Sequence, residues 1–165
     1  MDKLLNLILK IKENTGNFPC KKTVQKMVYL IQEKGINWEY DYSIHFYGPY
    51  SAELDSEIRY LNYCGKLNID ITSRQHTVSV VEENISTTLE DKAIEIIKCF
   101  AAKKPSDLEL LTTALYVQRE VPSATYEDIC DGVIKIKKNK YKQDAIKSAI
   151  DELVNNDYFS LACRL

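Results

Sequence analysis

One ten-residue segment combines three tyrosines, one of the two histidines and a Gly-Pro step: Tyr42-Ser43-Ile44-His45-Phe46-Tyr47-Gly48-Pro49-Tyr50-Ser51. Apolar residues recur at helical spacing before this segment and after it: Val24, Met27, Val28 and Ile31, then Leu54, Ile58 and Leu61. Because Gly-Pro is a strong turn signal, we expect an extended segment that ends in a sharp corner between two amphipathic helices.

The composition is that of an ordinary globular protein. The 165 residues are 45% hydrophobic and 28% charged, which is far from the disordered class. Five glycines and four prolines leave little room for long irregular loops, so helix should dominate. The net charge is −2, and neither half carries the basic excess that is usual in a domain that binds duplex DNA.

The cysteines favour a reduced protein without a metal site. Five are spread along the chain: Cys20, Cys64, Cys99, Cys130 and Cys163. Their number is odd and no Cys-x-x-Cys pair occurs, so we expect small buried thiols, no metal and no cofactor. The apolar N-terminal run is interrupted by polar residues and is too short to span a membrane. We therefore expect a cytoplasmic chain without membrane contact.

Periodicity and capping signals predict the elements in order. Helices are expected at 2–15, 20–34 and 51–64, a strand at 38–44, and a hairpin at 67–71 and 78–80 around Thr72–His76. Helices at 88–103, 106–119, 125–138 and 142–156 should follow, with capping boxes at Thr87 and Ser106 and a weaker one at Thr125. A helix that leads directly into a β-hairpin is the ending of a winged-helix unit.

The predicted fold class is mostly α (α+β). A winged-helix-like N-terminal half, residues 1–84, should pack against a C-terminal helical bundle, residues 85–165, in one compact unit. The spacing of Ser56, Ile58, Leu61, Gly65 and Leu67 also resembles that of Ser148, Ile150, Leu153, Asp157 and Phe159. If this echo is a duplication, Tyr158–Leu161 should form a strand; chance is the alternative.

Two motifs carry a family resemblance. Lys21-Lys22-x-x-Gln25-Lys26-x-x-Tyr29-Leu30 is followed, after about one further helix turn and a strand, by His45-Phe46-Tyr47-Gly48-Pro49-Tyr50-Ser51. In this combination the chain resembles the YwgA-like family of small prokaryotic proteins and, more distantly, the Panacea domain of SocA-like antitoxins. The resemblance implies a mostly helical, winged-helix-like protein that acts by binding, with a toxin or a protease as partner. His45-Phe46 departs from the Panacea pattern, which favours the YwgA-like branch.

The first candidate site is a helix face with two amines, an amide and a phenol. Lys22, Gln25, Lys26 and Tyr29 lie at positions i, i+3, i+4 and i+7. Such a face could bind a carboxylate-rich partner or a phosphate. The alternative is structural: the lysines are solvated, while Gln25 and Tyr29 hydrogen-bond to the Tyr-Gly-Pro segment and fix its corner.

The second candidate site is the aromatic segment itself. Tyrosine is enriched at interfaces because it adds contact area and keeps a polar tip, so Tyr47 and Tyr50 are candidate partner-binding residues, together with His45. Because the aromatic residues alternate, half of them should belong to an ordinary core. His45 has no neighbouring nucleophile or carboxylate cluster, and a packed histidine is the alternative.

A basic run is the third candidate site. Lys135, Lys137, Lys138, Lys140 and Lys142 stand at the end of one predicted helix and in the loop after it. They could contact a phosphate backbone, or they could simply complement a helix dipole. The run lacks the arginine that usually reads guanine edges. Glu53, Asp55 and Glu57 make the expected recognition helix acidic, which argues against insertion into a DNA groove.

The sequence thus predicts a protein-binding module rather than an enzyme. No Gly-rich phosphate loop, nucleophile elbow or His-Glu-x-x-His pattern occurs. The leading hypothesis is a non-enzymatic regulatory protein, antitoxin or adaptor that binds another protein. The alternative is a winged-helix transcriptional regulator that binds DNA, and a homodimer is compatible with either.

Overall fold

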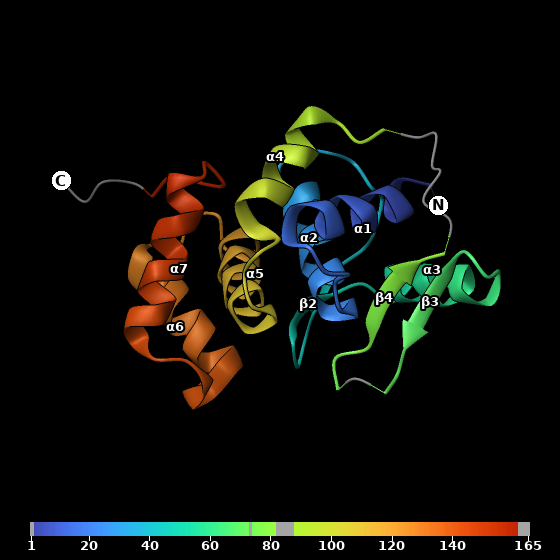
Figure 1. Cartoon of the computed structure of the whole chain (residues 1–165). Helices are drawn as coiled ribbons and strands as arrows, with labels where there is room; N and C mark the ends of the chain where they lie inside the picture. The colour runs from blue at the N-terminus through green and yellow to red at the C-terminus, as the bar shows by residue number, and fades with distance from the viewer. Residues whose placement is uncertain (1, 73, 82–87, 162–165) are drawn as a thin grey trace. The chain divides into compact units, whose positions relative to one another are not determined.

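The fold is α+β and mostly helical. The computed structural model describes residues 2–72, 74–81 and 88–161, which form the helices and two antiparallel strand pairs in Figure 1. The α-helices are α1 (Asp2–Thr15), α2 (Lys21–Glu33), α3 (Ala52–Tyr63), α4 (Asp91–Phe100), α5 (Pro105–Glu120), α6 (Tyr126–Lys137) and α7 (Gln143–Asn155). A short 3-10 helix, η1 (Lys138–Lys140), follows α6. Strand β1 (Ser43–His45) pairs with β2 (Gly48–Tyr50), and β3 (Leu67–Asp70) pairs with β4 (Thr77–Val80).

The chain divides into two compact units. The first unit comprises residues 1–42 and 51–105, and the second comprises residues 43–50 and 106–165. The boundary predicted between residues 84 and 85 falls outside the described residues, and the division lies after Pro105 instead. The reason is that α4 packs on α1 and α2 and buries its apolar side chains there, so it belongs with the N-terminal helices.

The core of the first unit is built from one apolar stripe on each helix. The buried residues at helical spacing include Leu4, Ile8 and Ile11 in α1, Val24, Met27 and Ile31 in α2, and Leu54, Ile58 and Leu61 in α3. Figure 1 shows the β3–β4 hairpin beside α3. Cys20, directly before α2, forms an isolated antiparallel bridge with Thr77 of β4, which ties the start of α2 to this hairpin.

The second unit contains α5, α6, α7 and the β1–β2 hairpin. Helices α6 and α7 lie side by side (Figure 1). The weakest predicted capping box is fully formed: the Thr125 hydroxyl accepts a bond from Asp128 N–H at 3.2 Å, and Thr125 N–H donates to the Asp128 carboxylate at 2.8 Å. The box predicted at Ser106 is wrong, because α5 already begins at Pro105. Thr87 lies outside the described residues.

The corner predicted at Gly48-Pro49 is displaced by two residues. Gly48 and Pro49 belong to strand β2, with His45 opposite Gly48 and Ile44 opposite Pro49. The chain therefore turns at Phe46 and Tyr47, which form the two-residue loop of a hairpin. The predicted strand 38–44 shrinks to Ser43–His45 because the Gln32 side chain, rather than a neighbouring strand, pairs with the backbone of Tyr40.

The similar spacing in residues 56–67 and 148–159 reflects the same type of helix C-terminus in both segments. Lys66 N–H donates to Leu61 O at 2.9 Å, and Tyr158 N–H donates to Leu153 O at 3.0 Å. Gly65 and Asp157 both have positive φ, at 72° and 55°, as the residue after a helix has in a Schellman motif. No strand forms at residues 158–161, which the structure describes, so that prediction is wrong.

Two of the cysteines are not the small core residues that were predicted. Cys20 and Cys130 are buried free thiols, whereas Cys64 and Cys99 are exposed free thiols. Cys163 lies outside the described residues. Within those residues no helix is both long and apolar enough to cross a membrane.

Candidate functional site

The β1–β2 hairpin is anchored on α5 by a close approach of its backbone. Gly48 has a φ of 85° and is buried, and a Cβ atom added to it would lie 2.9 Å from Thr113 Oγ1 and 3.4 Å from the carbonyl oxygen of Glu109. Any other residue at position 48 would have to push the hairpin away from the helix and would be strained by its φ. The glycine is thus required by both the conformation and the contact.

A buried ionic cluster lies beneath the hairpin loop. The Glu109 carboxylate accepts hydrogen bonds from Lys137 Nζ at 2.8 Å and from Lys140 Nζ at 2.6 Å. Lys137 Nζ also donates to the carbonyl oxygen of Phe46 at 2.9 Å. The side chains of Glu109 and Lys137 are 0% and 2% exposed, whereas that of Lys140 is 39% exposed. We call these three residues the Glu109 cluster; it connects α5, α6, η1 and the hairpin loop.

The Glu109 cluster also organises aromatic rings around its exposed lysine. Lys140 Nζ lies 5.7 Å from the ring centre of Tyr47 and 5.4 Å from that of Tyr141, within the range of a cation–π contact. Burial, and after it the charge of Glu109, raises the pKa of Tyr141. Its hydroxyl donates to Ser106 O at 2.9 Å.

The loop of the hairpin presents apolar and aromatic side chains to solvent. Phe46 is 76% exposed and Tyr47 is 52% exposed, with their rings edge to face at 5.0 Å. Ile44 and His45 are exposed beside them, and the His45 ring lies 5.4 Å from that of Tyr50. We call Ile44, His45, Phe46 and Tyr47 the hairpin tip. Exposed aromatic side chains on a firmly held loop are typical of contact sites for other molecules.

The predicted helix face on α2 is not an exposed surface. Gln25, Lys26 and Tyr29 are only 3%, 1% and 3% exposed, and Lys22 is half-buried. Gln25 instead pairs with the backbone of Ser51: its amide NH2 donates to Ser51 O at 2.9 Å, and Ser51 N–H donates to its amide oxygen at 3.0 Å. Gln25 thus has the structural role expected as the alternative, whereas Lys26 is buried and not solvated as that alternative expected. None of these three side chains is open to a partner protein.

The predicted basic run is divided by the fold. Lys137 is buried and bound to Glu109, so its assignment as a phosphate contact is wrong. Lys140 shares the same carboxylate. Lys135, Lys138 and Lys142 are exposed. The structure thus places part of this run next to the aromatic hairpin tip, a proximity that the sequence did not suggest.

The sequence did not indicate the roles that Glu109 and Phe46 have in this site. Glu109 was interpreted as a capping residue, although an acidic side chain flanked by Leu108 and by Leu110 and Leu111 is a signal of a buried charge that needs a partner. Phe46 was interpreted as a family feature and as one of the alternating aromatic residues, but not as a candidate contact residue. Its exposure follows from its place in a two-residue loop. The sequence prediction missed this loop because it placed the corner at Gly48-Pro49.

The site has no features of a metal centre. Among residues 2–72, 74–81 and 88–161, no group of three or more His, Cys, Asp or Glu side chains could hold a metal ion.

The chain is partly similar to one curated protein. Over 61 residues it is 34% identical to a protein of Bacillus subtilis (strain 168) with the name Uncharacterized protein YwgA, and the match covers 37% of this chain and 37% of the relative. The chain is YwgA-like over this segment. This confirms the resemblance predicted from the two motifs, while the more distant resemblance to the Panacea domain has no such support. No family model matches the chain, and no solved structure matches it.

Proposed function

We propose that this YwgA-like chain is a non-enzymatic protein-binding module and that the hairpin tip is its contact surface. The observation that carries the proposal is the 76% exposure of Phe46 on a loop whose carbonyl is bound by a buried lysine. A large apolar side chain held in this way loses little conformational entropy when it enters a pocket, which favours binding.

The chemistry of the tip defines the kind of partner. Phe46 and Tyr47 supply aromatic area, and the exposed lysines Lys138 and Lys140 of η1 supply positive charge nearby. A protein with an apolar pocket and carboxylates at its rim would complement both properties. The regulatory, antitoxin or adaptor role, with a toxin or a protease as the partner, rests on the family resemblance alone.

A site-specific cross-linking experiment tests the proposal. A photo-reactive phenylalanine analogue is placed at position 46 in one sample and at position 63 in another, because Tyr63 on α3 is an equally exposed aromatic residue, 88% exposed, in the other unit. Irradiation in the native host should yield one discrete adduct from position 46 and none from position 63. Mass spectrometry of the adduct identifies the partner.

A matched pair of variants tests the energetic role of the tip. F46A/Y47A should lose capture of the cross-linked partner and keep the melting temperature of the wild type, because both side chains are largely exposed. Y63A should keep both properties. Undiminished capture by F46A/Y47A would show that the tip is not the contact surface.

The alternative is a winged-helix regulator that binds DNA, and one observation favours it. In the first unit three helices precede the β3–β4 hairpin, and Cys20 before α2 pairs with Thr77 of that hairpin; a winged-helix unit has its elements in this order. Against it, Glu53 is exposed on α3, and the basic run belongs to the other unit.

A gel shift at low salt distinguishes the two functions. The variant to compare is K135Q/K138Q/K142Q, because these three lysines are exposed and are not part of the Glu109 cluster. The protein-binding proposal predicts no shift of duplex DNA by the wild type. A salt-dependent shift that this variant abolishes would support the regulator instead.

A further inference from the structure

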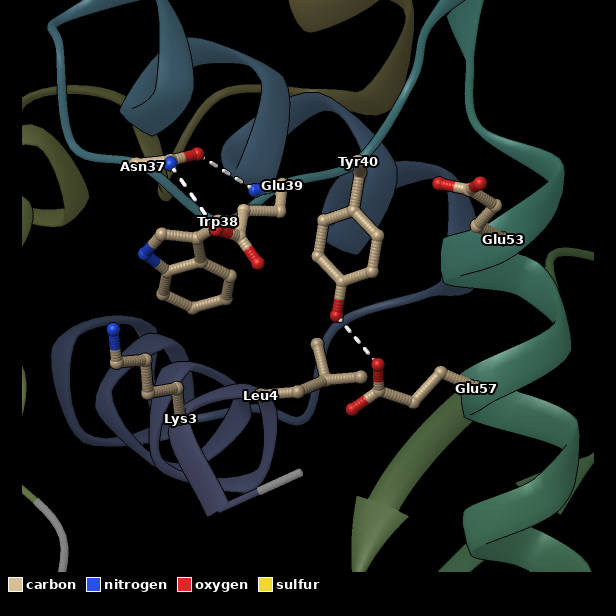
Figure 2. Close-up of a pocket in the computed structure, with 8 residues that line it drawn as sticks. All are labelled: Lys3, Leu4, Asn37, Trp38, Glu39, Tyr40, Glu53 and Glu57. Carbon is tan, nitrogen blue, oxygen red and sulfur yellow. Dashed lines mark hydrogen bonds between the residues drawn. The ribbon is translucent and has the colours of Figure 1, made fainter.

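A hollow in the first unit has the composition of a cation-binding pocket. It has a volume of about 460 Å³, which is in the range of small-molecule sites. The start of α1, the segment that follows α2 and the first turns of α3 form its walls, and Figure 2 shows their side chains facing one another. The lining residues are Lys3, Leu4, Asn37, Trp38, Glu39, Tyr40, Glu53 and Glu57.

Hydrogen bonds fix Tyr40 and Glu39 in the lining of the pocket. The amide of Gln32 donates to Tyr40 O at 3.0 Å and accepts from Tyr40 N–H at 3.1 Å. The Tyr40 hydroxyl donates to Glu57 at 2.7 Å (Figure 2). Glu39, at a φ of 61°, is held by a bond from its N–H to the Asn37 side chain at 3.0 Å. This part of the lining is thus preformed, so a ligand would not have to order it.

The charge of the lining is negative. Three carboxylates and one amine give the lining a formal charge of −2. Within the described part of the chain, neither Glu39 nor Glu53 forms an ion pair. Burial raises the pKa of Tyr40, and the hydrogen bond and charge of Glu57 and then the charge of Glu53 raise it further. The phenol therefore experiences the negative field of both carboxylates on α3.

This combination selects one class of ligand. Anions are repelled, and the carboxylates form no group that could hold a metal ion, as far as the described residues show. A flat or alkyl-substituted cation can contact the indole and phenol faces while its N–H groups bond to carboxylates. We propose that this pocket binds an organic cation, namely an alkylammonium or guanidinium group.

Trp38 provides the test, since it is the single tryptophan of the 165-residue sequence. Its fluorescence is followed while agmatine or spermidine is added at constant ionic strength, and in a second arm while an acetylated and amidated Gly-Arg-Gly peptide is added. Saturable binding is expected in at least one arm. Saturation by the amines alone identifies a free cation as the ligand, and saturation by the peptide identifies the side chain of a polypeptide.

Variants of single carboxylates test whether the pocket is the site. E53Q and E57Q should each weaken binding by about tenfold, the loss of one charge contact of ~1.4 kcal/mol. E95Q is the matched control, because Glu95 is an exposed carboxylate on α4 of the same unit, away from the pocket; it should bind like the wild type. Since Glu53 is exposed, E53Q should fold even if E57Q does not. The proposal is wrong if the wild type gives no saturable change in either arm, or if E53Q and E95Q bind equally.

Discussion

Gln25 and Gln32 lie seven residues apart on α2, and each pairs its side-chain amide with the backbone N–H and C=O of one distant residue. Gln25 binds Ser51 and Gln32 binds Tyr40 in this way. Since residues 43–50 belong to the second unit, the two amides hold both ends of the segment that leaves the first unit and returns to it. Gln25 of the first family motif thus fixes Ser51, the last residue of the second motif.

Replacement of Gln25 by alanine should strongly destabilise the first unit. Ser51 is 0% exposed, so Q25A leaves its N–H buried without an acceptor, at about 1–3 kcal/mol. The Ser51 carbonyl keeps the bond that it accepts from Asp55 N–H at 3.2 Å. Q32A is the matched control, because the bonds to Tyr40 are only part-buried and water can replace them. Urea unfolding should show a loss of about 1–3 kcal/mol for Q25A and below about 1 kcal/mol for Q32A. Equal losses would contradict this account.

A side chain at position 48 should destabilise the protein, both because of the positive φ and because of steric overlap with α5. G48A combines a positive φ with a Cβ atom 2.9 Å from Thr113 Oγ1, whereas G16A has a comparable φ of 78° and open space around it. We expect a loss of about 1 kcal/mol for G16A and of about 2–4 kcal/mol for G48A. Addition of T113A to G48A should restore the part of the lost stability that comes from the steric overlap. In a double-mutant cycle, the double variant should therefore be more stable than the sum of the two single effects predicts. Additive effects would show that Thr113 is not the obstacle.

The helices could be predicted from the sequence because their signals are local. Apolar spacing placed α1 at the residues where it lies, and the bounds of α2, α5 and α7 differ from the prediction by one residue or so. A structural bond from Gln25 to the Tyr-Gly-Pro segment was also one of the two alternatives for this helix face. Local chemistry was therefore sufficient for element type and for one contact.

The site could not be predicted because its contacts join residues that are far apart in the sequence. Lys137 is 28 residues from Glu109 and 91 residues from Phe46, and no periodic pattern encodes such a pairing. The lysines were considered as phosphate contacts or as a complement of a helix dipole, while the hairpin was considered as a corner. Only the packing of β2 on α5 brings the two together, through the glycine at position 48.

Asp55 should make the stability of the first unit depend on pH at the acidic end. Burial alone would raise the pKa of Asp55, but its ion pairs with Lys21 and Arg59 outweigh burial and lower the pKa. A depressed folded-state pKa contributes stability that is complete above the unfolded pKa of about 4 and is lost as the pH falls through the folded value.

Urea unfolding of the wild type and of D55N at several pH values measures this contribution. D55N should lose about 1–3 kcal/mol at pH 7, the usual value of hydrogen bonds to a charged group. The difference between the two proteins should shrink as the pH is lowered from about 5 towards the folded pKa. A pH-independent difference would mean that the carboxylate charge is not what Asp55 contributes.

Removal of one charge of the Glu109 cluster should destabilise the fold strongly, whereas removal of both buried charges together should destabilise it much less. E109Q leaves Lys137, 2% exposed at its side chain, without its carboxylate, and such an uncompensated buried charge costs about 3–5 kcal/mol. K137M leaves the carboxylate with Lys140 alone and should cost a similar amount. In E109M/K137M both buried charges are gone and Lys140, which is 39% exposed, can turn to solvent. Its stability should therefore exceed that of either single variant.

Hydrogen exchange separates this electrostatic role from the support of the hairpin. Both K137M and E109M/K137M remove the donor to the Phe46 carbonyl, so the amides of residues 43–50 should exchange faster in both, whatever their global stability. E109Q keeps that donor. When the two variants are compared under conditions that give them the same free energy of unfolding, the hairpin amides should exchange more slowly in E109Q than in K137M. If the tip is the contact surface, partner capture should follow hairpin protection rather than the free energy of unfolding. Capture that followed global stability instead would mean that the Lys137–Phe46 bond has no specific role in binding.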